Sequence, residues 1–478
     1  MFRPFPAFKS NKNKCSWRRS ALITVQNRLV TYPAPSGAVG NSDFKVRVRS
    51  TEGEWQELFC YNVKVDMHDV RNASMVYFDC SGPVEVEVIK NVGEVEEAVI
   101  RPLSSGLECA YSGNRVTFML DRPRKLSLEV NGDRFHNLHI FANPLEENVP
   151  DPADPEVIFF GPGMHILEEP QLRIPSGKTV YIAGGAVVVG ALVCEHVHDV
   201  TIRGRGLLYM SDFEKTTYYR GVQITFSKNI TIEGIITVDP PHYTVLIGQS
   251  EHISIRNLKT FSTRGWSDGI DMMSCSHINI DDVFLRTSDD CIAIYGHRGE
   301  FDGDSRNVTV RNSTLWADVA HPMNIGTHGD SENGGNVIEN IVFENIDILE
   351  HHEPQSDYWG CMAINPGDNN TVRNIRYENI RIEQFELGEL FNIRVVHNPK
   401  YNPHPGKRVE NIYFKDIIFN GICENPSRIE GFDETRLVDG VTLENVIVNG
   451  RPLKLDSEDI LIGSYVHNVN IIQNKDSI

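Results

Sequence analysis

The stretch Ile230-Thr-Ile232 is one of ten short segments of the same form, and their repetition decides the fold. Each segment has an aliphatic residue, a central residue that is usually polar, and a second apolar residue. The copies recur at intervals of 23 to 37 residues. They occupy residues 200–202, 230–232, 253–255, 278–280, 308–310, 341–343, 375–377, 412–414, 441–443 and 469–471. One strand in constant phase, with no helical periodicity between copies, predicts the stacked coils of a right-handed parallel β-helix.

Asparagine precedes several of these copies, at Asn229, Asn307, Asn340, Asn374 and Asn411. A residue repeated at one turn of successive coils predicts an internal ladder whose side-chain amides satisfy backbone groups. We therefore interpret these asparagines as structural and not as catalytic. Leucine-rich repeats are the rival architecture, but they require a Leu-x-x-Leu-x-Leu phrase that the sequence lacks.

The chain before the repeats shows a different pattern. Polar and apolar residues alternate with a period of two in residues 43–49, 61–66, 84–89, 115–120 and 125–130. Alternation with turns between the runs predicts half-buried antiparallel strands. Four prolines, Pro144, Pro150, Pro152 and Pro155, then mark a stiff linker. The predicted organisation is all-β: a β-sandwich domain over residues 1–145, a proline-rich linker over 146–155 and the β-helix over 156–478.

Composition excludes several classes of partner. The chain has 478 residues and a net charge of −19, which opposes sequence-independent nucleic-acid binding. The apolar run at 21–25 is too short for a signal peptide or a membrane span. Nine cysteines without any CxxC spacing predict free thiols and a reducing compartment. We therefore expect a cytoplasmic protein with no membrane partner.

Two phrases concentrate carboxylates within the repeats. Ser267-Asp-Gly-Ile-Asp271 and Ser288-Asp-Asp-Cys-Ile-Ala-Ile294 place Asp268, Asp271, Asp289 and Asp290 within 23 residues, between apolar neighbours. Asp268 and Asp289 are 21 residues apart where the local repeat is 25, so we expect them on neighbouring coils at almost the same angle. A bend just before Cys291 is needed to turn both Asp289 and Asp290 outward. The pattern indicates a site of chemistry and not a solvated charge run.

The two phrases resemble the NTDG and DDCIAI signatures of the polygalacturonases, glycoside hydrolase family 28. Pro241-His-Tyr-Thr244 resembles another phrase of that family, one coil earlier, and the resemblance covers about residues 156–450. A sandwich ahead of such a helix is similar to the dextranase and isopullulanase relatives in family 49. The resemblance implies a pectin-lyase-like β-helix that hydrolyses α-linked poly- or oligosaccharides with inversion.

Carried over residue by residue, the resemblance implies a general acid at Asp290 and a water-activating pair at Asp268 and Asp289. Crowded carboxyl groups cannot all ionise freely, which agrees with such a division of roles. The supporting histidine of the family has no literal match. Its position favours His321, in Ala320-His-Pro-Met-Asn-Ile-Gly326, over His328.

The departures from the family pattern bear on the substrate. The cations that hold a galacturonate carboxylate would fall at Ala363-Ile-Asn365, and Tyr295 stands where a lysine is usual. A uronic acid loses its charge-assisted partner without them, which slightly favours a neutral sugar. Arg298 and Arg394 are the candidate substitutes. The remaining predicted substrate-binding residues are Tyr243, Trp266, Asp271, Tyr295, His328 and Asn365.

Two other classes compete with a hydrolase. One is a polysaccharide lyase whose acids hold Ca²⁺, and the other is a non-catalytic carbohydrate-binding β-helix. Under the hydrolase hypothesis we expect no metal and no cofactor, because the cluster at His351, His352 and Glu353 lacks the spacing of a zinc motif. Residues 351–359 interrupt the repeat and predict a loop over the cleft. The expected partner is an oligo- or polysaccharide, attacked in an exo or oligosaccharide-preferring mode.

Overall fold

The computed structural model describes residues 28–356 and 358–473. The basic terminal segment and Cys15 lie outside that range. The regular structure is almost entirely β, with two single-turn 3₁₀ helices, Leu103–Ser105 and Lys215–Thr217, among the described residues. The described residues contain no helix long and apolar enough to cross a membrane. The eight described cysteines are free, as predicted.

The N-terminal part consists of two sheets packed face to face. One sheet has the order β1 (Leu29–Thr31), β5 (Arg71–Cys80), β11 (Asp133–Pro144), β10 (Arg124–Val130) and β7 (Ala98–Arg101), with β4 (Tyr61–Val65) beside β5. The other has the order β3 (Gln56–Leu58), β2 (Phe44–Ser50), β6 (Val84–Lys90), β9 (Arg115–Leu120) and β8 (Ala110–Ser112). The inward residues of the alternating runs, such as Val46, Val86 and Leu128, form the shared core. This confirms the predicted sandwich strands, although β5 and β11 pair in parallel.

The rest of the chain coils into one continuous structure of 28 strands with three parallel faces. The first face contains β12 (Val157–Phe160), β14 (Thr179–Ile182), β16 (His198–Gly204), β19 (Lys228–Glu233), β22 (Glu251–Arg256), β25 (Ser276–Asp281), the first halves of β28 (Ser305–Ala317), β30 (Val337–Glu350), β32 (Thr371–Ile382), β34 (Arg408–Phe419) and β36 (Val438–Val448), and β39 (Val466–Ile472). All ten predicted repeats pair in one unbroken row on this face, from Val200 through Ile341 to Val469. The parallel β-helix predicted from their spacing is therefore confirmed.

The other two faces complete each coil. The second contains β13 (Gly163–Arg173), the first half of β15 (Ala186–Glu195), β17 (Leu207–Tyr209), β20 (Ile236–Val238), β23 (Lys259–Phe261), β26 (Phe284–Thr287) and the second halves of β28 to β36. The third contains the end of β15, β18 (Val222–Thr225), β21 (Val245–Gly248), β24 (Ile270–Met273), β27 (Ile292–Tyr295), β29 (Met323–Ile325), β31 (Gly360–Ile364), β33 (Glu389–Arg394), β35 (Ser427–Glu430) and β38 (Ile460–Ile462). The short β37 (Arg451–Pro452) turns back on β36. The boundaries at 145 and 156 stay predictions, although β11 ends at Pro144 and β12 begins at Val157.

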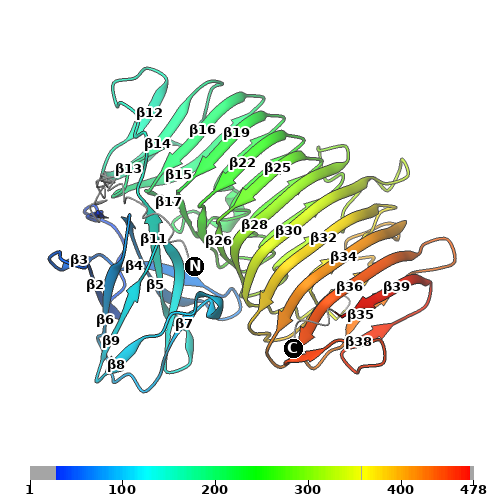
Figure 1. Cartoon of the computed structure of the whole chain (residues 1–478). Coiled ribbons are helices and arrows are strands. Elements are labelled where there is room, and N and C mark those ends of the chain that lie inside the picture. The colour runs from blue at the N-terminus through cyan, green and yellow to red at the C-terminus, as the bar shows by residue number, and fades with distance from the viewer. Residues whose placement is uncertain (1–27, 357, 474–478) are drawn as a thin grey trace, which may run out of the picture.

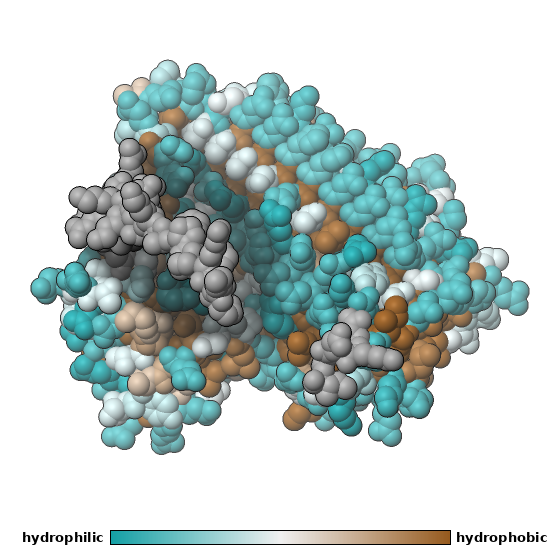
Figure 2. Space-filling model, in the orientation of Figure 1, coloured by the Kyte–Doolittle hydropathy of each residue, from teal (hydrophilic) through white to brown (hydrophobic). Residues whose placement is uncertain are grey.

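The asparagine row, defined as Asn307, Asn340, Asn374 and Asn411, lies on the outside of the coils and is not internal as predicted. Each residue has a left-handed backbone with φ between 55° and 59°. The Nδ2 atoms of Asn340, Asn374 and Asn411 each donate to the Oδ1 atom of the preceding member, at 3.2, 3.1 and 2.7 Å. The amides therefore satisfy one another and not the backbone. Figure 2 shows how side chains of similar hydropathy continue in rows from coil to coil.

The sandwich packs against the outside of the second face, beside the N-terminal coils (Figure 1). The contact is largely aromatic, with Phe141 of the sandwich against Phe261 and Phe284 of the coils. Within it, the fully buried Arg286 forms an ion pair with Asp318 at 2.9 Å. Its guanidinium also donates to Asn137 Oδ1 of β11 at 3.1 Å. The buried charge of Arg286 at this contact is therefore paired, as a buried ion pair requires.

Candidate active site

The candidate site lies at the turn where each coil passes from the second face to the third. The first residues of four successive third-face strands, β21, β24, β27 and β29, pair in register: Val245, Ile270, Ile292 and Met323. The residues two positions earlier, Tyr243, Asp268, Asp290 and His321, therefore stack on four successive coils, which we call the acid row. Parallel strands lie about 4.8 Å apart, so neighbours in this row are within reach of one another.

Asp289 reaches the same place by a local bend. The backbone bends at Ser288 and Asp289, as required by the sequence prediction. Asp290, and not Asp289, shares the register position of Asp268, because Ile270 pairs with Ile292. One carboxylate oxygen from each of Asp268, Asp289 and Asp290 lies within 4.8 Å of the others. The structure therefore brings the three predicted acids into one cluster.

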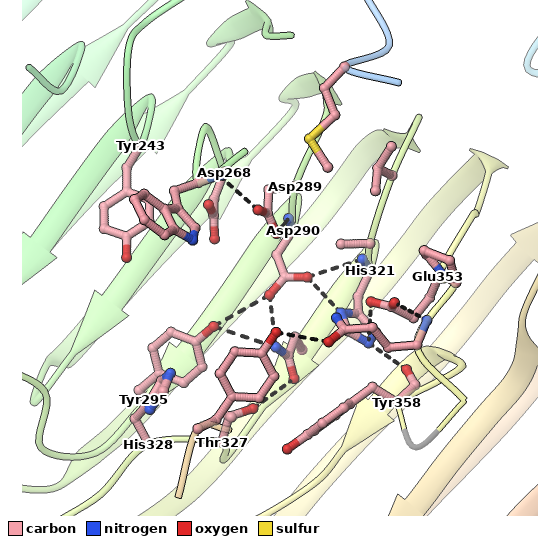
Figure 3. A pocket seen from close by; sticks show the side chains of 18 of the residues that line it. Tyr243, Asp268, Asp289, Asp290, Tyr295, His321, Thr327, His328, Glu353 and Tyr358 are labelled. Atoms are coloured by element: carbon pink, nitrogen blue, oxygen red, sulfur yellow. Dashed lines mark hydrogen bonds and ion pairs between the residues drawn. The ribbon is translucent and has the colours of Figure 1, made fainter. Parts of the chain in front are cut away.

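The cluster faces a cavity of about 270 Å³ (Figure 3). This volume is near the lower end of ligand pockets, which run from about 300 to 1,000 Å³. Predicted residues that line it are Tyr243, Trp266, Asp268, Asp289, Asp290, Tyr295, Arg298, His321 and His328. Tyr243 and Tyr295 are almost fully buried, whereas Trp266 is 53% exposed. The cavity thus combines aromatic surface with carboxylates in a small space.

Asp290 has the most hydrogen-bond donors of the three acids. His321 Nδ1 lies 2.6 Å from its Oδ1, and Asn324 Nδ2 donates to its Oδ2 at 2.8 Å. Burial alone would raise the pKa of Asp290, but the charge of His321 and these hydrogen bonds lower it below the usual value. Burial opposes a charge on His321 too, yet Asp290 raises its pKa to about 9. The pair is therefore an ionised carboxylate beside an imidazolium.

Asp268 and Asp289 have the opposite electrostatic character. Burial, followed by the charge of Asp290, raises the pKa of Asp289 to about 7. Burial, followed by the charges of Asp271 and Asp289, raises the pKa of Asp268 well above its usual value. Asp289 accepts hydrogen bonds from the backbone amides of Trp266 at 2.8 Å and Asp290 at 3.1 Å. Asp268 Oδ1 has no hydrogen-bond partner among the described residues.

The choice of histidine follows from these contacts. His321 contacts Asp290 directly, and its Nε2 atom lies 2.6 Å from the Tyr358 carbonyl oxygen. His328 packs instead against the ring of Tyr295, at 5.0 Å. Burial, followed by the charge of Arg298, lowers the pKa of His328 to about 3, so it is neutral. Of the two candidates, only His321 is placed to support an acid.

Two predicted substrate-binding residues do not reach the cavity. Asp271 lies on β24, and its side chain is fully buried on the outer side of the third face. It forms an ion pair with Arg298 at 3.9 Å. Asn365 is also fully buried, and its Nδ2 atom donates to Asn392 Oδ1 at 2.8 Å. Both predictions are corrected, because neither side chain is accessible to a ligand. Of the two substitute cations, Arg298 lines the cavity, whereas Arg394 pairs with Glu430 at 3.2 Å.

Several cavity residues were missed by the sequence analysis. They are Met67, His68, Asn324, Thr327 and Tyr401, with neighbouring Val319 and Ala320. Four further lining residues, Glu353, Pro354, Gln355 and Tyr358, belong to the loop at 351–359 that was predicted over the cleft. Asn324 stands between Met323 and Ile325, which face the inner core, so period-two alternation could have identified it as an outward residue. Glu353 was visible in the predicted loop, and its Oε2 atom lies 3.6 Å from His321 Nε2. Met67 and His68 come from the β4–β5 turn of the sandwich and had no signal in the repeats.

The fold and this cleft define the class of parallel β-helix proteins with an acidic cleft on one face. The family model described as glycosyl hydrolases family 28 matches residues 200–460, and the chain belongs to that family. A polygalacturonase of Juniperus ashei is 23% identical over 270 residues, which are 54% of this chain and 49% of the relative. The chain thus spans about half the length of this curated relative.

Solved structures extend the likeness in fold to the sandwich. Dex49A from Penicillium minioluteum superposes with a TM-score of 0.64 at 14% identity, covering 91% of this chain and 96% of that one. The family 28 exopolygalacturonase of Yersinia enterocolitica gives a TM-score of 0.51 at 10% identity, covering 80% and 96%. These likenesses show the architecture, including the layout with a domain ahead of the β-helix.

Proposed function

We propose that the protein hydrolyses α-linked oligo- or polysaccharides at the cavity on the third face. The observation that carries the proposal is the cluster of Asp268, Asp289 and Asp290, whose environments set their protonation states apart. Pairs of carboxyl groups with divided protonation supply the acid and the base of glycoside hydrolysis. Membership of family 28 supports the same reaction class.

The hydrogen bonds support a different division of roles from the one that the resemblance implied. We assign the general acid to Asp289, because its pKa near 7 keeps it substantially protonated at neutral pH. Asp290, held ionised by His321 and Asn324, is assigned to deprotonate the attacking water. Asp268, on the adjacent coil, is assigned to position that water or the sugar.

Inversion is the stereochemical outcome that the family resemblance favours. The close approach of the three carboxylates, within 4.8 Å, favours retention as a second candidate outcome. Retaining enzymes hold their two carboxyl groups about 5 Å apart. The same cluster could hold a divalent cation, which keeps the calcium-dependent lyase as a distinct alternative.

A reducing-sugar screen of pectic, α-glucan and galactan oligosaccharides tests the proposal, with proton NMR of the first product. Hydrolysis that persists in excess chelator, with initial inversion of the anomer, is the expected result. An unsaturated product would indicate a lyase, and binding without turnover would indicate a carbohydrate-binding protein. Release of galacturonic acid would overturn the expectation of a neutral sugar and would leave Arg298, which lines the cavity, as the candidate partner of its carboxylate. A neutral product would agree with the missing family cations.

A further inference from the structure

Two segments from opposite sides of the third face meet over the cavity. Residues 351–356 come before β31, at the turn from the second face, and residues 397–405 follow β33, at the opposite side of the same face. Gln355 Oε1 accepts hydrogen bonds from Tyr401 Oη at 2.8 Å and from Lys400 Nζ at 3.1 Å. Gln355 and Tyr401 both line the cavity. Their contact is a bridge between the two segments at the cavity.

Both ends of this bridge are anchored to the coils. On one side, Glu353 N donates to the Leu387 carbonyl at 2.8 Å, and Tyr358 N donates to the Gln355 carbonyl at 2.9 Å. On the other side, Asn402 Nδ2 donates to the Thr327 carbonyl at 2.5 Å and to Asp368 Oδ2 at 3.0 Å. The Tyr401 ring also packs edge-on against Tyr358, with ring centres 5.8 Å apart. The bridge is therefore part of the fold and not a single surface contact.

The bridge lies at the edge of the cavity on the side of the C-terminal coils. No described residue beyond Tyr401 lines the cavity. The opposite side is different, because Trp266 is 53% and Tyr218 is 45% exposed there. Their rings stack at 6.3 Å with an angle of 27°. Partly exposed aromatic rings suit the apolar faces of sugar rings, although Lys215 Nζ lies over the Trp266 ring, 4.9 Å from its centre. Among the described residues, this pair offers a longer chain a surface to follow.

We infer that the enzyme acts at a chain end, with the terminal sugar held between the acids and the Gln355–Tyr401 bridge and the rest of the chain leaving over Trp266 and Tyr218. This inference rests on the proposed hydrolase function. The small volume of about 270 Å³ limits the enclosed product to a short piece, a mono- or disaccharide. The bridge thereby determines where a chain is cut.

The experiment uses the full chain and a polysaccharide that it hydrolyses in the screen. Product lengths are followed by chromatography from the first per cent of reaction, together with viscosity. The wild type should release only mono- or disaccharide from the start while viscosity stays nearly constant. The double variant Gln355→Ala/Tyr401→Ala should release intermediate lengths and lower viscosity at least several-fold faster per bond cleaved.

Two control variants accompany the double variant. Tyr401→Phe keeps the ring and removes one hydrogen bond, and should shift the product pattern only partly. Tyr111→Ala alters an exposed tyrosine of the sandwich and should leave the wild-type pattern. Intermediate lengths from the wild type at the earliest times, or a double variant that folds and keeps the wild-type pattern, would overturn the inference. Absence of hydrolysis on every glycan would instead refute the proposed function.

Discussion

The asparagine row and the acid row are both built by stacking one position of successive coils, yet they use the stack in opposite ways. In the asparagine row the same side chain recurs, and each amide is satisfied by the next, from Asn307 to Asn411. In the acid row successive coils supply different side chains, and carboxylates of like charge are brought together. One of their oxygens, Asp268 Oδ1, has no hydrogen-bond donor among the described residues. A side chain repeated at one position of successive coils therefore indicates a role in stability of the fold. A position where the side chain changes from coil to coil indicates the candidate site.

The strongest test of this contrast is removal of the proposed acid. Asp289→Asn should lower kcat by roughly 10²–10⁴-fold, because general acid catalysis contributes about that much. Its Tm should not fall, because the substitution removes a charge from a crowded cluster. Steady-state kinetics and thermal unfolding measure the two effects. Asp456→Asn, at an exposed acid far along the chain, is the matched control and should change neither.

The pH profile gives the next largest effect. Asp289 has a pKa raised to about 7, so its protonated form disappears as the pH rises above 7. The kcat/KM should then fall about tenfold per pH unit, because the free enzyme loses its acid. The lowered pKa of Asp290 places the acidic limb of the profile below the usual carboxylate range. A basic limb that stays unchanged in Asp289→Asn would contradict this assignment.

His321 links the acid row to stability. Its folded pKa of about 9 lies above the unfolded value near 6.5, so the contact with Asp290 stabilises fully below pH 6.5 and is lost as the pH rises through 9. This shift in the pKa of His321 corresponds to a contribution to the free energy of unfolding on the order of 3 kcal/mol. Unfolding by urea at pH 6 and pH 9.5 should show this loss in the wild type. In His321→Gln the difference between the two pH values should shrink markedly.

The asparagine row should show the smallest effect, and only on stability. Asn340→Ala removes a hydrogen bond and places a Cβ-bearing residue without local hydrogen bonding in a left-handed conformation, which together cost about 1–3 kcal/mol. Asn340→Gly removes the same hydrogen bond without that strain and should cost less. Urea unfolding measures both, and kcat should not change. Asn420→Ala, outside the row, provides the comparison, and an activity loss in Asn340→Gly would break the contrast.

The same contrast explains what the sequence could predict. The ten repeats and the acids are local patterns, so Ile230 and Asp268 could be placed from the chain alone. Asn365 was misplaced because it was carried over from the position of the family's cations, whereas its side chain is fully buried here and bonded to Asn392. The intervals on the first face also differ from those on the third, which is why Asp290 and not Asp289 shares the position of Asp268. Met67 could not be predicted from the repeats, because the sandwich and not the β-helix supplies it.

Tyr401 shows a further limit of the same kind. It follows the third face three coils beyond Asp289 and Asp290, in a segment whose path depends on hydrogen bonds such as that of Asn402 with Asp368. No periodicity carries information about such a path. The loop at 351–359 was predicted over the cleft, and four of its described residues line the cavity. The contact of Gln355 with Tyr401 depends on tertiary structure and could not be predicted.

The aromatic contact between the sandwich and the second face has a consequence for biosynthesis. The sandwich leaves the ribosome before the coils, and N-terminal domains fold first during synthesis. Phe141 is then already in place when Phe261 and Phe284 emerge. These outward-facing aromatic side chains of a nascent coil meet a preformed apolar partner within their own chain. The order of the two parts thus shields the growing helix from association with other chains until its later coils have been added.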